Sequence, residues 1–261
     1  AGKARDVAGP ADRRRKLGFV TDATEDDVEA ALHLASASAR NWDGLGGAAR
    51  AEIIGKAADG IEADLPLLMA LAVREGGKTL GDALAEVRET VDFCRYYASR
   101  ARSDFAEPVS LPGPTGERNT LSLRGRGVFA CISPWNFPMA IFCGQVAAAL
   151  AAGNAVIAKP AEQTPLAAAA IVRHLLAAGV PGSVLHLLPG DGATIGGRLV
   201  ADRRVDGIAF TGSIETAKAI NRTLADRDGA IVPLIAETGG LNAMIVDSSA
   251  LAEQVVKDVI T

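Results

Sequence analysis

Aromatic residues, cysteines and long apolar runs are all scarce in this chain of 261 residues. Only 4% of the residues are aromatic, whereas alanine and glycine are abundant. We therefore expect a core made by helices packed closely on a sheet rather than one filled by aromatic rings. No run of about 18 consecutive apolar residues occurs, so the sequence predicts no membrane-spanning helix.

Cysteine usage and charge exclude several classes of protein. Cys94, Cys131 and Cys143 are too few and too scattered for a disulfide framework, and they form no metal-ligand pair. This usage is typical of a reducing compartment and favours the cytoplasm. The net charge of −4 gives no electrostatic reason to expect nucleic acid as a partner. The basic N-terminal segment has no apolar core behind it, so no secretion signal is predicted.

Helical patterns dominate the first part of the chain. Thr24 is a predicted N-cap that is followed by acidic residues and by apolar residues at helical spacing. Three more helices are predicted over about 48–63, from Asp64 to the "REGGKT" segment, and over about 80–104. The segment "EPVSLPGPTGERN" then indicates a loop, and "TLSLRGRG" indicates a short exposed hairpin strand.

From residue 127 the pattern changes to alternating strands and helices. Apolar runs recur about every 23–29 residues with a helical segment between each pair, which is the rhythm of consecutive βαβ units. The runs begin near Val128, Ala155, Val184, Gly207 and Val232. The sequence therefore predicts an α/β fold with an open, doubly wound parallel sheet. Ligands of such sheets bind at the carboxyl ends of the strands, where Pro- or Gly-marked turns follow each run.

The predicted organisation has four parts. Residues 1–105 form an N-terminal helical part, 106–127 a linker with an exposed strand, and 128–240 the α/β domain. Residues 241–261 indicate one more strand and the start of a helix capped by serines. Because the chain lacks an initiating Met and stops at Thr261 within this helix, we expect it to be a piece of a longer protein.

Two glycine-containing turns are candidate phosphate sites. In "FTGS", residues 210–213, Gly212 permits a tight turn and Ser213 can cap the next helix, whose free N–H groups suit a pyrophosphate. A plain strand–turn–helix with a serine cap is the alternative. "PGDGATIGG" is an incomplete dinucleotide fingerprint, because Ile195 occupies the third glycine position. A tight turn that could still line a cofactor crevice is the better interpretation of this segment.

Three other turns carry polar side chains. In "AKPAEQTP", Lys159 and Glu162 could bind ribose hydroxyls, although a solvated loop with two ordinary charges is the simpler interpretation. Asn136 in "SPWNFP" could donate to a developing oxyanion or could satisfy its own backbone. Glu237 ends the apolar run of "PLIAETGG", which we expect to be a buried strand. It could cap a neighbouring turn or act as a general base.

Taken together, these turns carry a family resemblance. "PWNFP", "KPAEQTP", "FTGS" and "AETGG", in this order and at these spacings, are similar to the NAD-dependent aldehyde dehydrogenase superfamily. The longer strings "ISPWNFPMAIFCGQVAAALAAGNAVIAKPAEQTPLAA" and "PLIAETGGLNAMIVDSSALAEQVVKDVIT" resemble one branch. That branch is the L-glutamate-γ-semialdehyde (pyrroline-5-carboxylate) dehydrogenase domain of bifunctional proline utilization A proteins. The resemblance implies a Rossmann-like sheet of the aldehyde dehydrogenase type, and an exposed flap strand.

The resemblance also implies roles for individual residues. The Asn136 amide would stabilise the tetrahedral oxyanion, and Glu237 would activate the water that hydrolyses an acyl-enzyme. Lys159 and Glu162 would bind the adenosine ribose, and Ser213 the pyrophosphate. The full set of implied cofactor-binding residues is Ile132, Trp135, Lys159, Glu162, Gly192, Gly212, Ser213 and Gly239.

One implied residue is missing. The family needs a cysteine thiolate that attacks the aldehyde, and it lies in a "GQRC"-like stretch after the "ETGG" glutamate. No cysteine follows Glu237 here, and the three cysteines present are better interpreted as small buried hydrophobes. We therefore expect an NAD-binding portion that by itself binds NAD weakly or not at all and has no turnover. We also expect a large exposed apolar surface where the rest of a catalytic domain would pack.

Several partners follow from the same resemblance. In the parent protein they are an aldehyde substrate, the rest of the catalytic domain, an upstream proline dehydrogenase module and further copies of the chain. Two alternatives remain open: a nucleotide-binding module without catalysis, and a structural remnant that has lost the cofactor. Lys159, Glu162 and Ser213 argue against the remnant, because it has no need of all three residues.

Overall fold

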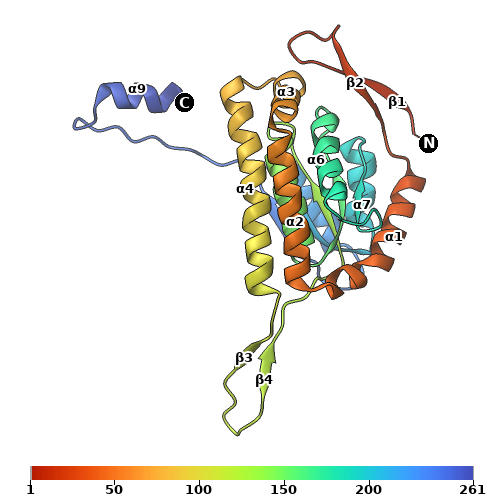
Figure 1. Ribbon diagram of the computed structural model, residues 1–261. Coiled ribbons are helices and arrows are strands. Elements are labelled where there is room, and N and C mark those ends of the chain that lie inside the picture. Colours follow the sequence, from red (N-terminus) through yellow and green to blue (C-terminus); the bar gives the residue numbers. More distant parts are fainter. Residues whose placement is uncertain (1, 261) are drawn as a thin grey trace.

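A parallel sheet forms the centre of the protein. The structure, a computed structural model, describes residues 2–260 (Figure 1). The five strands of the sheet lie in the order β7–β6–β5–β8–β9, and every neighbouring pair is parallel. They are β5 (Val128–Ile132), β6 (Ala155–Lys159), β7 (Leu185–Leu187), β8 (Val205–Thr211) and β9 (Leu234–Glu237).

Helices cover both faces of the sheet. On one face α5 and α6 pack on the strands, and α2, α3 and α4 form an outer layer over them (Figure 1). On the other face lie α1, α7 and α8. The helices are α1 (Glu25–Gly44), α2 (Gly46–Ala63), α3 (Leu65–Gly76), α4 (Leu80–Asp104), α5 (Ala140–Ala151), α6 (Pro165–Ala177), α7 (Gly197–Ala201), preceded by a π-helical turn η1 (Gly192–Gly196), α8 (Ile214–Ala225) and α9 (Ala252–Ile260). The prediction of an open, doubly wound parallel sheet is confirmed.

The strand order creates a switch point between β5 and β8. The chain moves from β5 outward through β6 to β7, then returns to the other side of β5 for β8 and β9. Crossovers therefore leave the carboxyl ends of β5 and β8 in opposite directions, which opens a crevice between them. Gln145 of α5 joins these two ends: its Nε2 donates to the carbonyl of Ile132 at 3.3 Å and to Oγ1 of Thr211 at 3.0 Å.

Capping side chains fix several helix starts, and those at Thr24 and Ser213 were predicted from the sequence. Thr24 and Asp27 form a reciprocal capping box at α1, and Thr79 accepts from the backbone N–H of Asp82 at α4. Ser213 caps α8 in the same way. Helix α5 has no such cap and is apolar on nearly all sides, because it lies between the sheet and the outer helices.

Two strand pairs were not predicted in full. An N-terminal antiparallel hairpin joins β1 (Ala4–Ala8) and β2 (Lys16–Thr21), within the part expected to be helical. Farther along, β3 (Val109–Leu111) pairs with β4 (Asn119–Leu121), so part of the predicted loop is a strand. Strand β4 overlaps the exposed hairpin strand that "TLSLRGRG" predicted. The other three strands were not predicted, because they depend on contacts between paired strands rather than on a local pattern. The β3–β4 hairpin projects from the body (Figure 1).

The C-terminal part departs most from expectation. Strand β9 is a short edge strand whose last three residues are exposed, and so the prediction of a buried strand is wrong. The strand expected after Gly240 does not form, because no neighbouring strand pairs with this segment. Helix α9 does form, but the predicted serine cap does not: the helix begins at Ala252, and the Ser249 hydroxyl donates to Asp247 instead. Thr261 lies outside the described residues. None of the described helices is both long and apolar enough to span a membrane.

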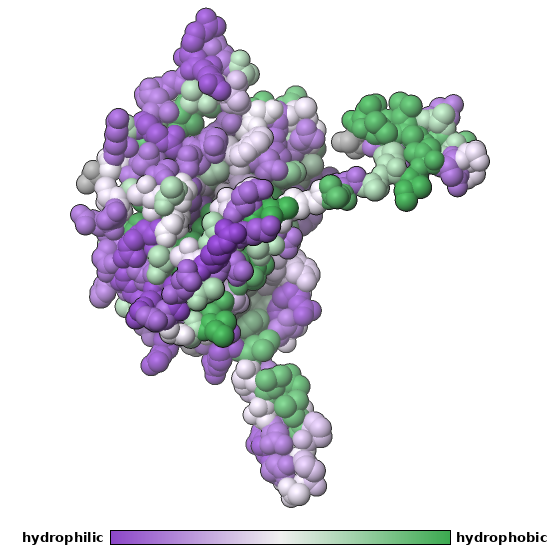
Figure 2. Space-filling model, turned by 180° about the vertical axis from the view of Figure 1, so that it is seen from behind, coloured by the Kyte–Doolittle hydropathy of each residue, from purple (hydrophilic) through white to green (hydrophobic). Residues whose placement is uncertain are grey.

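The expected apolar surface is present. Helix α9 stands away from the body (Figure 1), and most of its apolar side chains are exposed (Figure 2). Ile231, Leu241 and Ile245 are each more than nine-tenths exposed. In the body, an apolar cavity of about 460 Å³ lies between α4, α5 and the β8–β9 edge, with Phe93 and Ile235 in its wall. Exposed apolar surface of this extent is typical of an interface.

Candidate functional site

Two adjacent cavities lie at the carboxyl ends of the strands. The first, here the α7–α8 cavity, has a volume of about 750 Å³ and is lined by Ile132, Glu162, Gly192 and residues of α7 and α8. The second, here the strand-end cavity, has a volume of about 520 Å³. Its lining includes the predicted residues Trp135, Asn136, Gly212, Ser213, Glu237 and Gly239. Of the predicted site residues, Lys159 alone lines neither cavity, and it lies beneath Glu162.

The turn from β8 into α8 presents a helix N-terminus to the strand-end cavity. The hydroxyl of Ser213 accepts from the backbone N–H of Thr216 at 3.1 Å, which fixes the first turn of α8. A Cβ atom at Gly212 would lie 2.6 Å from the ring of Phe210, so the turn needs glycine there. Free N–H groups and the helix dipole at this point favour an anionic group.

Glu162 links the two loops that wall the α7–α8 cavity. Its Oε1 accepts from the backbone N–H of Gly192 at 2.8 Å and lies 3.7 Å from Nζ of Lys159. Burial lowers the pKa of Lys159, although the nearby Glu162 opposes this shift. A carboxylate at the cavity wall accepts hydrogen bonds from hydroxyl groups, whereas it repels a phosphate group.

A buried ion pair supports the turn that carries Asn136. Oε1 of Glu86 accepts from the backbone N–H of Met139 at 2.9 Å, just before α5 begins. Nζ of Lys78 lies 2.8 Å from Oε2 of Glu86 and 3.7 Å from the centre of the Phe137 ring. The Asn136 amide is exposed and makes no hydrogen bond within residues 2–260. The amide is thus a free donor at the wall of the strand-end cavity.

Glu237 lies across the same cavity. Its backbone pairs with Thr211 of β8, and its carbonyl accepts from the N–H of Gly212 at 3.1 Å. These bonds hold the end of β9 beside the turn that carries Ser213. The Glu237 side chain is exposed rather than buried, because β9 is the outermost strand and nothing in residues 2–260 covers its outer side. Glu237 is therefore positioned at the site without the burial that the sequence predicted.

All three cysteines are buried and line neither cavity. Burial raises the pKa of Cys131 to about 12. The hydrogen-bonding contact with Cys94, together with burial, raises the pKa of Cys143, and the two sulfur atoms are 3.3 Å apart. A thiol in such surroundings is a poor nucleophile, because the thiolate is the reactive form. This agrees with the prediction that the cysteines are small buried hydrophobes.

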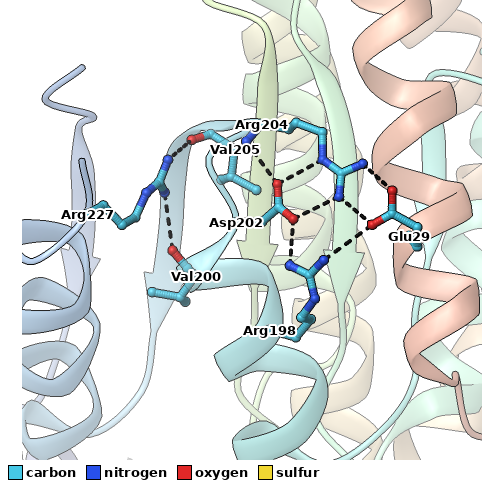
Figure 3. A network of polar contacts seen from close by, with 7 residues as sticks. All are labelled: Glu29, Arg198, Val200, Asp202, Arg204, Val205 and Arg227. Carbon is cyan, nitrogen blue, oxygen red and sulfur yellow. Dashed lines mark hydrogen bonds and ion pairs between the residues drawn. The ribbon is translucent and has the colours of Figure 1, made fainter. Parts of the chain in front are cut away.

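An ionic network holds the α7 wall of the α7–α8 cavity (Figure 3). Arg204 donates to both carboxylate oxygens of Glu29 on α1 at 2.6 Å, and also binds Asp202 at the end of α7. Arg198 of α7 donates to the same two carboxylates. Arg227, just after α8, donates to the backbone carbonyls of Val200 and Val205, which flank Asp202 and Arg204 in the chain. The wall is therefore fixed to α1 and to the end of α8.

Supporting residues were missed by the sequence analysis. They are Lys78, Glu86, Gln145 and Arg5. Gln145 had a usable signal, because it is the one polar side chain in the apolar helix over 140–151. In the sequence, Lys78 and Glu86 look like ordinary charges at a helix start. Their contacts with the turn that carries Asn136, through Phe137 and Met139, join residues more than 50 positions apart.

Glu75 makes the start of α6 sensitive to pH. Its carboxylate accepts from the N–H groups of Leu166 and Ala167 at 2.8 and 2.7 Å. Burial raises the pKa of Glu75 to about 7, against the opposing effects of these two N–H groups and of Arg5. The folded protein thus binds a proton more tightly than the unfolded chain, whose glutamate titrates near 4.5.

Stability should therefore fall as the pH rises from about 4.5 to about 7, and the Glu75 contribution should level off above that. Relative to Glu75→Gln, the native chain should lose up to about 3 kcal/mol over this range. Urea unfolding at several pH values would measure the difference. Glu52→Gln, at an exposed position of α2, should leave the pH profile unchanged. If the stability of the native chain and that of Glu75→Gln changed with pH in the same way, the raised pKa of Glu75 would be contradicted.

Fold and site together define a class of protein. The model of the aldehyde dehydrogenase family matches residues 1–261. The chain belongs to the aldehyde dehydrogenase family. The bifunctional protein PutA of Escherichia coli (strain K12) is 51% identical over 263 residues, which cover 100% of this chain and 19% of PutA. The chain thus spans about a fifth of the length of that curated relative.

Solved structures agree with this family. A structure of proline utilization A with proline bound in remote sites matches with a TM-score of 0.90 and 55% identity, covering 92% of this chain and 25% of that chain. A 1-pyrroline-5-carboxylate dehydrogenase from Thermus with bound NAD matches with a TM-score of 0.87 and 33% identity. That match covers 92% of this chain and 47% of the Thermus chain.

Proposed function

We propose that the chain is the NAD-binding portion of a dehydrogenase that oxidises L-glutamate γ-semialdehyde to L-glutamate in proline catabolism. One observation carries the proposal: Ser213 at a helix N-terminus and the Glu162 carboxylate line adjacent cavities at the switch point of the sheet. The similarity to PutA and to a 1-pyrroline-5-carboxylate dehydrogenase supports the substrate and the pathway of the proposal.

The residues present fit a dinucleotide. The α7–α8 cavity would take the adenosine part, with Glu162 accepting from ribose hydroxyls and Ile132 in the wall. The N–H groups at the start of α8 and the Ser213 hydroxyl would hold the pyrophosphate. When bound, NAD supplies the hydride acceptor for aldehyde oxidation. Because a carboxylate repels the additional phosphate of NADP, Glu162 favours NAD.

Two residues of the strand-end cavity have proposed chemical roles. The Asn136 amide, a free donor at the cavity wall, would stabilise negative charge that develops on the aldehyde oxygen. The Glu237 carboxylate would take a proton from the attacking water. Trp135 and Gly239 complete the wall. Lys159, buried beneath Glu162, would act through that carboxylate or reach the ribose directly.

The nucleophile would come from outside this chain. In the parent protein we propose the rest of the catalytic domain, an upstream proline dehydrogenase module and further copies of the chain as partners, in the cytoplasm. A second candidate function is nucleotide binding without catalysis. It is favoured by one observation, which is that no described cysteine lines either cavity.

Calorimetry with NAD, together with an aldehyde-oxidation assay on the same sample, tests the proposal. NAD should bind weakly, NADP should bind more weakly still, and no turnover should be detected. Glu162→Ala should weaken NAD binding by about tenfold, because a charge-assisted hydrogen bond is lost. Absence of NAD binding would contradict a cofactor site made by these residues. Turnover would contradict a nucleophile from outside the chain and would require one of the three buried cysteines.

A further inference from the structure

The N-terminal hairpin β1–β2 contacts both loops that wall the α7–α8 cavity. It lies beside α3 and α6 (Figure 1), and a Cβ atom at Gly18 would come within 3.0 Å of the Leu166 side chain at the start of α6. Val7 of the hairpin is buried. The hairpin is therefore packed on the body and does not move as a free arm.

Arg5 makes the contact with the first loop. Its Nε donates to both carboxylate oxygens of Asp22, at 3.1 and 3.0 Å, which orients the guanidinium. Its Nη2 then donates to the backbone carbonyl of Glu162 at 2.9 Å. Because the guanidinium is planar and rigid, the bond to Asp22 fixes the direction in which Arg5 meets Glu162.

The same end of the hairpin also holds the second loop. The backbone N–H of Ala23, next to Asp22, donates to the carbonyl of Pro189 at 2.7 Å. Pro189 lies three residues before Gly192, whose N–H binds the Glu162 carboxylate. The two loops are thus joined in two ways. The Glu162 carboxylate binds the Gly192 N–H directly, and the hairpin binds both loops through Arg5 and through Ala23.

We propose that the hairpin is a clamp for the adenosine end of the cofactor cavity, and that Arg5 is a positioning residue for Glu162. The inference rests on the proposed function. Without Arg5 the 160–164 loop loses its bond to the hairpin, and the Glu162 carboxylate no longer has a single position toward the ribose. The nicotinamide end is unaffected, because the clamp does not contact the strand-end cavity residues Asn136 and Glu237.

Half-cofactor ligands separate this role from a general loss of stability. Arg5→Gln should weaken ADP and NAD binding by about tenfold, as expected for one lost charge-assisted bond, and leave nicotinamide mononucleotide binding unchanged. Asp22→Asn should do the same to a smaller extent. Arg14→Gln is the matched control, because Arg14 lies in the turn of the same hairpin, is exposed and, within residues 2–260, pairs only with its neighbour Asp12. Equal weakening of both half-ligands would overturn the proposal.

Hydrogen exchange tests the clamp without any ligand. The Gly192 amide should exchange about tenfold faster in Arg5→Gln than in the native chain or Arg14→Gln, because its acceptor Glu162 is less well held. Unchanged exchange at Gly192 would overturn the clamp. If the native chain binds neither ADP nor NAD, the proposed function fails, and the exchange result alone decides whether the clamp exists. If the native chain binds both and Arg5→Gln binds equally well, the clamp fails and the proposed function stands.

Discussion

Replacing Arg50 with methionine should lower the free energy of unfolding by about 3–5 kcal/mol. The Arg50 side chain is only 1% exposed and forms an ion pair with Asp43. Its guanidinium donates to the carbonyl of Ala151 at 3.0 Å and to that of Asp43 at 2.7 Å, joining the ends of α1 and α5 to α2. Methionine fills similar volume but removes the buried donor to these two carbonyls and the ion pair with Asp43. The Asp43 carboxylate keeps the backbone N–H of Gly125, at 2.9 Å, and the nearby Arg124.

Urea unfolding followed by circular dichroism would measure this change. Arg40→Met is the matched control, because Arg40 is on the exposed side of α1 and should change stability by less than about 0.5 kcal/mol. If Arg50→Met lowered the free energy of unfolding by less than about 1 kcal/mol, the prediction would be wrong. Packing of the methionine side chain would then compensate for the lost ion pair, as happens at some buried ion pairs.

Ser213→Asp should reduce the affinity for NAD by at least about 100-fold. Aspartate is as good an N-cap as serine, so α8 should form normally. Its charge, however, would lie where the pyrophosphate is proposed to bind, at the first turn of α8. Two like charges about 4 Å apart near a protein surface repel by about 4 kcal/mol, which exceeds what a 100-fold loss requires.

Ser213→Asn separates charge from shape. Asparagine has nearly the same size as aspartate and also caps helices well, but it is neutral. In calorimetry it should cost less than about tenfold in NAD affinity. If both variants lost NAD affinity equally, side-chain size rather than charge would be responsible. The absence of an effect of charge would then contradict a pyrophosphate site at the first turn of α8.

Local signals were enough to predict the body of the fold. The N-caps Thr24 and Ser213 marked helix starts because capping depends on side chains only three residues apart. The regular spacing of apolar runs predicted the parallel sheet and therefore the edge at which the site residues meet. Because the carboxyl ends of parallel strands meet at one edge, the sequence also predicted that these residues lie close together, and all but Lys159 line the two adjacent cavities.

Other features depend on contacts between distant segments. The β1–β2 hairpin is held by the bond of Arg5 to Glu162, a residue 157 positions away, and no local pattern indicates it. Apolar content predicted burial for β9, yet burial depends on what packs beside a strand, and periodicity cannot identify an edge strand. For the same reason the segment after Gly240 has strand-like composition and no strand.

The close contact of the Cys94 and Cys143 sulfur atoms has a consequence for how the body opens. One cysteine lies on α4 and the other on α5, so the pair spans the junction between the outer helices and the layer next to the sheet. A thiol reagent in solution can reach either sulfur only when these two helices separate. The rate at which Cys94 and Cys143 are modified in the native protein, resolved from that of Cys131 in β5, therefore measures how often these two helical layers separate.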